Sequence, residues 1–396
     1  MSTLHHWLDQ LKPSVPDLAA SGWRQLDRLV DDLAVAVASA PVTSDSVQHR
    51  TWLQELRVDL AARGHHLPPG PQGATWQVMA QFVAGFHDLD LRDVTGHGHG
   101  ALLTDHGSSS TVARWRALLD AGALVGIAAT ERHGGSRIQE ITTRAVLGPD
   151  RRWYLNGEKC WISRLEEAAA FAVFFRDPDG RVSGAVVEAT EPGLHRELIA
   201  PLGLDGWTWG VLRFRDVAID PRQDLLGRPG EGLSVFRRHF AQFRPLVTAT
   251  ALGAAAGVHA HVTRCLAARS RIGMLSRIRD NALITLGRTN AEITAALLAA
   301  GAAARLAAAD HPQADLVSRV SKAAGVDTAN RTAGDLAPLI GATGFQQDHP
   351  VARARRHLAG LLYADGIHDS LYRSGGLALV AQALSTQSRA VLQLAA

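Results

Sequence analysis

The hydrophobic pattern of this 396-residue chain changes its period twice, and this change constrains the fold more than any other feature. Residues 1–123 place apolar side chains at helical spacing, as in WRQLDRLVDDLAVAVA, which predicts an N-terminal helical domain. Residues 124–236 carry short alternating runs separated by turns such as DPDGR, which predicts a central antiparallel β-barrel. Residues 237–396 form long, alanine-rich stretches, which predict a C-terminal four-helix bundle. The expected fold class is therefore a multidomain α+β protein.

The composition argues against several classes of protein. The 41 basic and 38 acidic residues leave a net charge of +3, and only three of the basic residues are lysines. Scattered arginines favour ion pairs and recognition of phosphate or carboxylate over binding of nucleic acid. Two cysteines are too few for a disulfide framework, the N-terminus lacks the features of a signal peptide, and the longest fully apolar run, AAAFAVFF, is too short to cross a bilayer. We therefore expect a cytoplasmic protein that is not embedded in a membrane.

Several familiar motifs are absent or incomplete. The run GHGHGALL places His97 and His99 in a glycine-rich loop, but no third ligand follows at usable spacing, so no metal site is expected. Lys159 lies in GEKC rather than in a Gly-Lys-Ser/Thr sequence, which argues against a phosphate-binding P-loop. The run LIGATGF lacks the spacing of a dinucleotide-binding turn, and no Gly-x-Ser-x-Gly elbow is present. The sequence therefore gives no support for a metalloenzyme, a Rossmann domain or a serine hydrolase.

Two segments of the β-region resemble the motifs of one family. The stretch GIAATERHGGSR resembles T-E-P-x-x-G-S-D, with Thr130, Glu131, Gly135 and Ser136 in register. About twenty residues further on, WYLNGEKCWIS resembles Y-x-L-N-G-x-K-x-W-I-T/S. Both motifs are those of the acyl-CoA dehydrogenases, and the resemblance continues to LYADGIHDSL at 362–371, so that it covers about two-thirds of the chain.

The resemblance implies a helical, β-barrel, helical subunit that binds FAD between the β-domain and the bundle, partly through a neighbouring subunit. It places Thr130, Trp161 and Ser163 on the flavin. An indole is suited to cover the face of a flat ring, and a hydroxyl can reach the ring edge. Taken alone, Trp161 would also suit packing inside the barrel, although the flavin contact is favoured, and Thr130 would suit a turn.

Further contacts to FAD and substrate are implied by the same resemblance. Arg269 matches an arginine that reaches the FAD pyrophosphate of a neighbouring subunit, a role that suits a planar, permanently charged guanidinium. Gly341 and Ala342 lie in a turn where the backbone can approach the same group. Ser136 and Arg244 are the expected substrate contacts. A homodimer or homotetramer is therefore expected, although Arg269 alone would equally suit a solvated helix.

The chemistry implied by the resemblance depends on Asp365. Acyl-CoA dehydrogenases remove a proton from the α-carbon of a thioester while a hydride leaves the β-carbon for the flavin. Their usual base is the glutamate of Tyr-Glu-Gly-Thr, and an ungapped alignment from Gly341 puts Asp365 at this position. A carboxylate in an apolar pocket has its pKa raised toward the value that a general base requires. The other position that the family uses is Phe243 here, which accepts no proton, whereas Asp365 alone would also suit a turn.

The sequence also departs from the family pattern. Arg132 and Arg137 replace the proline and the final acidic residue of the first motif, while Ala342 replaces a glycine and Ile367 a threonine. These changes remove contacts to the flavin or to the thioester tail. Their loss favours weaker FAD binding, an altered position of the bound FAD, or a substrate other than free acyl-CoA. We expect an acyl-CoA or an acyl carrier protein thioester, as in natural-product pathways with members of this family, and a separate electron acceptor for the flavin.

Two other functions remain open. Flavin monooxygenases share this fold, lack the carboxylate base and often carry His-Asp near this point, as His368 and Asp369 do here. A binding subunit that keeps the fold but has lost FAD is the third interpretation, and the departures from the pattern are its support. Asp365 favours the dehydrogenase.

Overall fold

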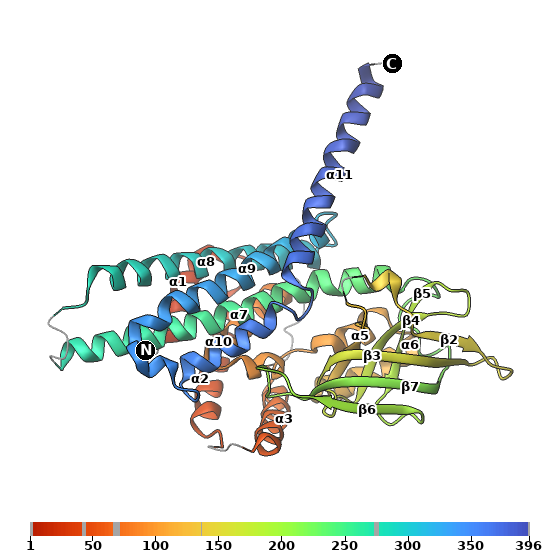
Figure 1. Cartoon of the computed structure of the whole chain (residues 1–396), viewed down its shortest axis with the longest axis horizontal. Helices are drawn as coiled ribbons and strands as arrows, with labels where there is room; N and C mark the ends of the chain where they lie inside the picture. Colours follow the sequence, from red (N-terminus) through yellow and green to blue (C-terminus); the bar gives the residue numbers. More distant parts are fainter. Residues whose placement is uncertain (1–2, 42–44, 66–71, 136, 273–276, 395–396) are drawn as a thin grey trace.

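The computed structural model describes residues 3–41, 45–65, 72–135, 137–272 and 277–394 (Figure 1). Its N-terminal part is helical, as the apolar spacing predicts. The elements in this part are α1 (Thr3–Leu11), α2 (Ala20–Ala38), α3 (Ser46–Ala62), α4 (Gly73–His87), the 3₁₀ turns Leu89–Asp93 and Gly98–Gly100, α5 (Ala101–His106) and α6 (Ser109–Asp120). Side chains cap some of these helices: Asp45 accepts a hydrogen bond from the Val47 amide at the start of α3.

The central part is one curled seven-stranded sheet with the form of a half-barrel. Its strands are β1 (Val125–Ala128), β2 (Arg144–Leu147), β3 (Trp153–Ser163), β4 (Ala170–Arg176), β5 (Val182–Glu188), β6 (Leu194–Ile199) and β7 (Trp209–Ile219). The strand order is β1-β4-β2-β3-β7-β6, and β5 pairs with β4. Most pairs are antiparallel, but β1 and β2 both run parallel to β4. Alternating apolar patterns predict strands but not their partners, because pairing depends on residues distant in sequence.

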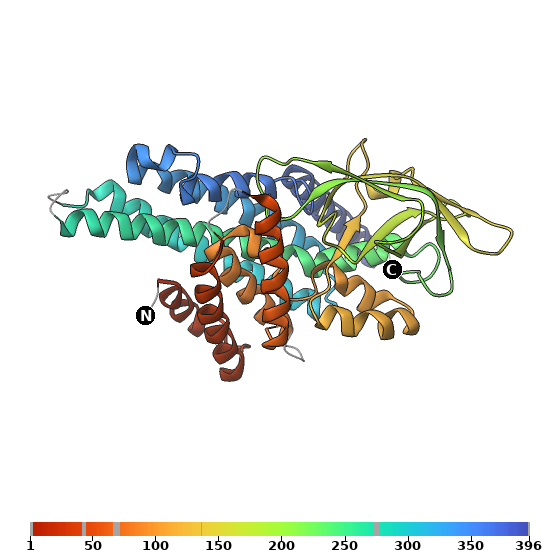
Figure 2. The same ribbon diagram turned by 90° about the horizontal axis from the view of Figure 1, so that it is seen from below.

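The C-terminal part consists of long helices. They are α7 (Gly232–Arg271), α8 (Asp280–Ala308), α9 (Ala314–Leu336), the 3₁₀ segment Ala337–Phe345, α10 (Pro350–Leu361) and α11 (His368–Leu394). Figures 1 and 2 show the sheet at one end of these helices, and Figure 1 shows α11 projecting from the body toward the C-terminus. The helical, β, helical order expected from the sequence is confirmed.

The N-terminal helices and the bundle share one core through close packing of α4 on α7. A Cβ atom at Gly85 would collide with the Thr250 carbonyl, and one at Gly253 would collide with the Phe82 carbonyl. Glycine therefore lets the two helix backbones approach each other at both contacts. Trp76, Phe82 and Leu252 are fully buried in the same cluster. This packing fixes the position of α4 and the loop after it relative to α7.

Within the described part of the chain, two helices, α7 and α8, are long and apolar enough to cross a membrane by length and composition. The most apolar stretch of α7 is mostly buried inside the protein, and that of α8 is partly buried. Core helices of soluble proteins have the same properties.

Candidate functional site

A cavity of about 1380 Å³ lies where the sheet meets the bundle. Its walls come from the loop that follows α4, the end of β3, the segment before β7, the N-terminal half of α7 and the turn between α10 and α11. Five of the residues predicted from the sequence line it: Thr130, Trp161, Ser163, Arg244 and Asp365. The fold thus brings together residues that are up to 235 positions apart in the sequence.

A β-bulge in β3 turns Trp161 toward the cavity. The pairing of β3 with β7 shifts register between Lys159 and Ile162, and Trp161 has a left-handed backbone with φ 58°. The bulge makes Lys159 and Cys160 consecutive buried residues and leaves the Trp161 side chain 56% exposed. A left-handed tryptophan is strained, and such strain is typical of functional sites. The result is a flat aromatic face at the cavity wall beside the Ser163 hydroxyl.

A buried ion pair fixes Thr130 relative to this bulge. The ammonium of Lys159 lies 2.8 Å from Oε1 of Glu131 and donates to the Ala129 carbonyl at 3.2 Å. It therefore binds both neighbours of Thr130. The Cys160 amide donates to the carbonyl of Thr130 itself at 2.9 Å. Burial alone would raise the pKa of Glu131, but the hydrogen bonds from Lys159 and from the Thr142 hydroxyl lower it to about 2. The two motifs noticed in the sequence are therefore one structural unit.

Asp365 lies in a tight turn that a second buried lysine holds in place. Asp365 has φ 56° and Gly366 has φ 107°, so the chain reverses sharply between α10 and α11. The fully buried ammonium of Lys322, on α9, donates to the carbonyls of Leu361, Ala364 and Gly366 at 2.8, 2.8 and 2.7 Å. Lys322 therefore positions the backbone on both sides of Asp365.

Charges around Asp365 act on its ionisation. Burial raises the pKa of the half-buried Asp365, while the positive charges of Lys322, Arg164 and Arg92 limit the rise. Arg164 donates to Ser163 and to Asp93, the latter at 2.8 Å, so it connects the end of β3 with the loop after α4. Cations from three other parts of the fold thus favour the ionised form of the carboxylate, while burial favours its protonated form.

Arg244 lines the cavity from α7. Its guanidinium lies 3.4 Å from Asp315 and 5.1 Å from the centre of the Phe240 ring. Burial lowers the pKa of Arg244 to about 10, which leaves it charged at neutral pH. Its Nε atom is buried and has no hydrogen-bond partner among the described residues. This free donor fits the expected substrate contact, which stays a prediction.

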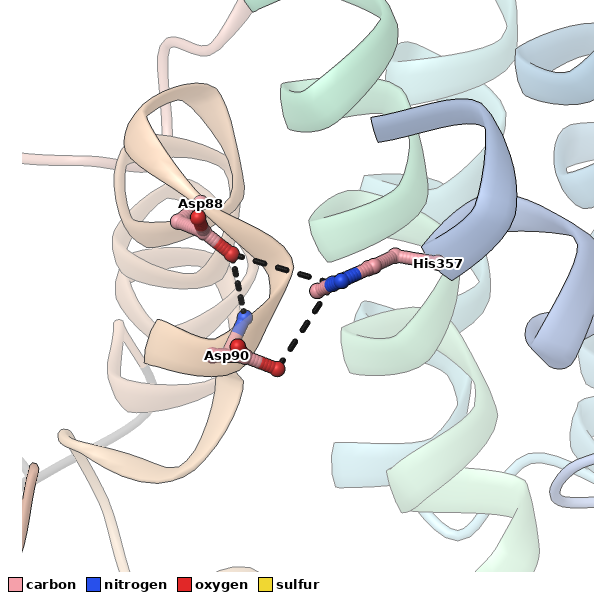
Figure 3. A group of neighbouring side chains, drawn as sticks. All are labelled: Asp88, Asp90 and His357. Atoms are coloured by element: carbon pink, nitrogen blue, oxygen red, sulfur yellow. Dashed lines mark hydrogen bonds and ion pairs between the residues drawn. The ribbon is translucent and has the colours of Figure 1, made fainter. Parts of the chain in front are cut away.

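An ion-pair network joins three parts of the fold beside the cavity. Among the described residues, Asp88, Asp90 and His357 place three possible metal-ligand atoms within 4.8 Å of one another (Figure 3). The oxygens of Asp90 already accept from the guanidinium of Arg353 at 2.8 Å and from the Gly206 amide at 3.1 Å. We interpret the cluster as a salt-bridge network, because protein donors occupy these oxygens.

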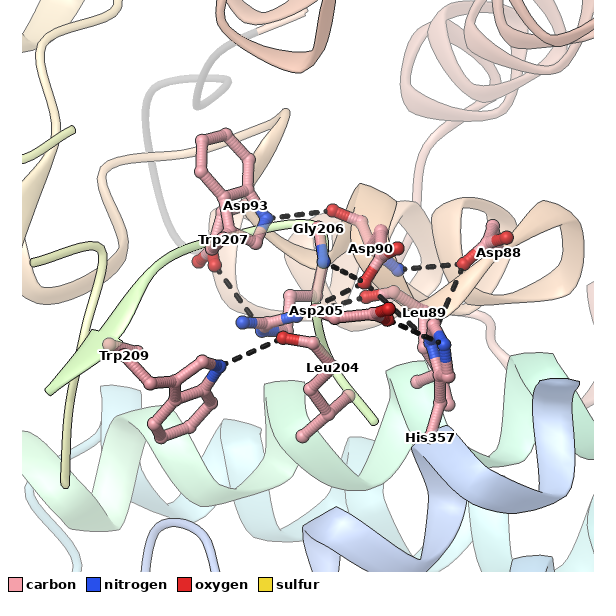
Figure 4. A network of polar contacts seen from close by, with 12 residues as sticks. Asp88, Leu89, Asp90, Asp93, Leu204, Asp205, Gly206, Trp207, Trp209 and His357 are labelled. Atoms are coloured by element: carbon pink, nitrogen blue, oxygen red, sulfur yellow. Dashed lines mark hydrogen bonds and ion pairs between the residues drawn. The ribbon is translucent and has the colours of Figure 1, made fainter. Parts of the chain in front are cut away.

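The same network holds two segments that line the cavity. Trp207 donates from its indole to the carbonyl of Asp90 at 2.8 Å, and Nε2 of His357 lies 3.1 Å from Asp205 (Figure 4). Burial alone would lower the pKa of His357, but the hydrogen bond to Asp205 and the charges of Asp90 and Asp88 raise it above its ordinary value. The network thus ties the loop before β7 and the loop after α4 to α10, which leads into the Asp365 turn.

Three predicted cofactor residues lie outside the cavity. Arg269 donates to the carbonyl of Ile340 at 2.8 Å, and next to it Gly341 has φ 75° and Ala342 is exposed. These residues are close to one another but do not line the cavity of their own chain. This placement is compatible with contact to a neighbouring subunit, which stays a prediction. Ser136 falls outside the residues that the structure describes.

Sequence reasoning missed several residues of the site. The sequence does not predict the contacts of Lys322 to the Asp365 turn, because they depend on how α9 packs against α10. The scarcity of lysine was a usable signal, because two of the three lysines are fully buried. Arg164 gave no signal among so many arginines, and His99 was considered only as a metal ligand.

Two models of acyl-CoA dehydrogenase domains match this chain. The middle domain matches residues 126–217, and the C-terminal domain matches residues 230–372. Together they cover more than half of the chain, so it belongs to the acyl-CoA dehydrogenase family.

Individual relatives agree with this assignment. A probable acyl-CoA dehydrogenase of Mycobacterium tuberculosis, FadE25, is 29% identical over 248 residues, which are 61% of this chain and 62% of that protein. The match thus spans less than two-thirds of the relative. The solved acyl-CoA dehydrogenase from Geobacillus kaustophilus has a TM-score of 0.77 at 18% identity, covering 91% of this chain and 98% of that one. The prolyl acyl carrier protein oxidase AnaB has a TM-score of 0.74 at 19% identity, covering 91% and 99%. These structures show the fold.

Proposed function

We propose that the protein is an FAD-dependent dehydrogenase that forms an α,β-double bond in an acyl thioester, with Asp365 as the base. The observation that carries this proposal is the meeting of Asp365, from the bundle, with Trp161 and Ser163, from the sheet, in the walls of one cavity. A base and a surface for a flat ring are the two parts that the reaction needs on the protein side. Family membership adds independent support.

The residues of the cavity fit FAD. The Trp161 indole is a large apolar surface left 56% exposed, and the hydroxyls of Thr130 and Ser163 line the same wall. These three residues would hold the flavin ring, and Arg269, Gly341 and Ala342 would contact the FAD of a neighbouring subunit. FAD, when bound, supplies the acceptor for the hydride that leaves the β-carbon.

Asp365 performs the proton transfer in this proposal. Its carboxylate removes a proton from the α-carbon, and the electron pair of that C–H bond becomes the new C–C π bond as hydride leaves the β-carbon. Burial raises the pKa of Asp365, which makes the carboxylate a better base than an exposed aspartate. Lys322 holds the turn that carries this carboxylate.

The substrate and partners belong to the same proposal. The thioester is carried by CoA or by an acyl carrier protein, and a separate protein reoxidises the flavin. The chain assembles as a homodimer or homotetramer in the cytoplasm. Apolar side chains left exposed on α8, such as Leu283 and Ile284, support assembly because they gain from burial.

The monooxygenase alternative is less well supported by the geometry. His368 lies 3.4 Å from Asp369, but neither residue lines the cavity, whereas Asp365 does. The Asp369 side chain is 86% exposed. A binding subunit without FAD would have no need for an uncovered indole at the cavity wall.

The test is an anaerobic reaction with the protein loaded with FAD. A panel of saturated acyl thioesters is added on CoA and on carrier protein, and the flavin absorbance and the thioester mass are recorded. We expect loss of the visible flavin band and a thioester lighter by two hydrogens. Protein that binds FAD but oxidises no thioester of either kind would contradict the proposal, and product that forms only with oxygen and reduced flavin would support the monooxygenase.

A further inference from the structure

A pair of buried histidines lies in the cavity wall and takes no part in the proposed chemistry. His99 lies in the 3₁₀ turn after α4, and His239 lies on α7. Their side chains contact each other through Nδ1 of His99 and Nε2 of His239 at 2.9 Å. The residues are 3% and 4% exposed, and both rings pack on Phe243, with centroid distances of 4.2 and 5.5 Å. Both residues line the cavity.

The pair is uncharged and has unused hydrogen-bonding capacity. Burial lowers the pKa of His239 to about 3 and that of His99 well below its ordinary value, so both rings are neutral at neutral pH. In a neutral pair, one ring nitrogen donates to the other. The outer nitrogens, Nε2 of His99 and Nδ1 of His239, are then one donor and one acceptor. Neither has a partner among the described residues.

Other uncharged polar groups line the same cavity. The Thr250 hydroxyl donates to Oε1 of Gln81 at 2.9 Å, and Nε2 of Gln81 lies 3.4 Å from the Thr95 hydroxyl. All three side chains are less than 10% exposed and come from α4, the loop after it and α7. A purely aliphatic acyl chain would leave the outer nitrogens of the histidine pair without partners, which disfavours its binding.

The wall lies within electrostatic reach of Asp365. Arg164 and Arg92 contribute to the lowered pKa of His99, and the same two arginines act on the pKa of Asp365. Asp93 lies 2.8 Å from Arg164 and 3.4 Å from Arg92, so it offsets their charge. The two histidine rings carry no charge, and neither do Gln81, Thr95 and Thr250, so this part of the wall suits a neutral polar group.

We infer that the pocket selects an acyl thioester whose acyl group carries a neutral hydrogen-bonding group, such as a hydroxyl, beyond the β-carbon, and that His99 and His239 bind this group. The inference rests on the proposed function, because it places an acyl chain in this cavity. A neutral group that both donates and accepts matches the two outer ring nitrogens.

The test compares binding of matched thioesters. Pantetheine is common to CoA and carrier proteins, so the probes are the pantetheine thioesters of hexanoic, 6-hydroxyhexanoic and adipic acids, with butyryl and 4-hydroxybutyryl forms as a shorter pair. Calorimetry on FAD-loaded Asp365→Asn protein, which the proposed function expects to be inactive, measures affinity without turnover. We expect at least one hydroxylated probe to bind at least about tenfold more tightly than its unsubstituted partner, the size of one hydrogen bond. Equal affinity, tighter binding of the plain chains, tightest binding of adipoyl, or no binding at all would overturn the inference.

Variants assign the preference to the histidine pair. His239→Leu is expected to reduce the preference to less than about threefold, and His239→Gln, which keeps hydrogen-bonding atoms, is expected to retain part of it. His261→Leu, on the same helix but outside the cavity, is the matched control and should keep the full preference. A preference that survives in His239→Leu would contradict the assignment. If His239→Leu does not fold, the comparison of plain and hydroxylated probes on Asp365→Asn protein still tests the preference of the pocket. His239→Gln then tests whether the histidine pair causes this preference.

Turnover by the unsubstituted enzyme separates this inference from the proposed function. Preferential binding of a hydroxylated probe without any oxidation of it would leave the pocket inference standing and contradict the dehydrogenase. Oxidation of plain and hydroxylated probes with equal efficiency would support the dehydrogenase and contradict the pocket inference.

Discussion

Two lysines are fully buried, one in the sheet and one in the helical bundle, and their surroundings differ. Lys159, on β3, forms an ion pair with Glu131 and holds the segment around Thr130. Lys322, on α9, donates to three backbone carbonyls of the turn that carries Asp365. Burial lowers the pKa of each lysine to about 8.

The difference lies in how each charge is balanced. The charge of Lys159 is balanced locally by the Glu131 carboxylate, so this pair mainly holds the segment around Thr130 in place. Among the residues that the structure describes, the direct partners of Lys322 are carbonyl oxygens, and Asp365 is the group that most offsets its burial. Lys322 therefore acts on both the position and the ionisation of the proposed base. Breaking each lysine should therefore give different results.

Removal of the base should have the largest effect. We expect Asp365→Asn to slow flavin reduction by a saturated thioester by about 100- to 10,000-fold, because general-base catalysis contributes this much. FAD binding should be unchanged, as measured by the flavin absorbance of the purified protein. Asp365→Glu, which keeps the carboxylate, is the control. It should keep most of the activity that Asp365→Asn loses. Equal rates for the parent and Asp365→Asn would show that another group removes the proton.

Removal of the structural lysine should mainly affect stability. Lys159→Met leaves the Glu131 carboxylate buried without its partner, which is expected to cost about 3–5 kcal/mol of the free energy of unfolding. Urea denaturation monitored by fluorescence measures this value. The double variant Lys159→Met/Glu131→Gln should recover part of the loss, because no charge is then left alone. Lys12→Met is the matched control, since Lys12 forms an exposed pair with Asp9 and should cost less than about 1 kcal/mol.

Removal of the positioning lysine should mainly affect the reaction. We expect Lys322→Met to lower the rate of flavin reduction by about 100-fold, because a small misplacement of a reacting group slows a reaction by about this factor. Its positive charge lowers the pKa of Asp365, so its loss should raise that pKa and move the acidic limb of the kcat/KM profile to higher pH. Lys159→Met should leave this limb in place. An unshifted limb in Lys322→Met would mean that the lysine supports only the fold.

The ion-pair network beside the cavity should give the smallest effect. His357 faces Asp88, Asp90, Asp205 and Arg353, and its pKa in the folded state is raised. Its contribution to stability should therefore be complete below about pH 6.5, the pKa of an unfolded histidine, and should be lost as the pH rises through the folded-state value. Denaturation midpoints measured from pH 5 to 9 test this, with His357→Gln as the comparison. The same slope in both proteins would exclude His357 as its source.

Sequence patterns predicted the order of the elements because helical and strand periods are local properties. The motifs also identified Trp161, Ser163 and Asp365, which the fold brings to one cavity. They could not predict the left-handed backbone of Trp161, because the bulge arises from the register between β3 and β7. The partners of Lys322 were likewise hidden, since its carbonyl acceptors come from a turn about 40 residues further on. Contacts between distant segments carried the information that the sequence alone lacked.

The most direct test of the central claim is the structure of the protein with FAD and an unreactive acyl thioester analogue bound. Trp161 and Asp365 should lie on the two sides of the space that the flavin ring and the acyl chain fill. The Asp365 carboxylate should point at the α-carbon, close enough to take its proton. A flavin ring bound away from Trp161, or an Asp365 carboxylate turned to solvent in the complex, would contradict the assignment of this cavity as the site of dehydrogenation.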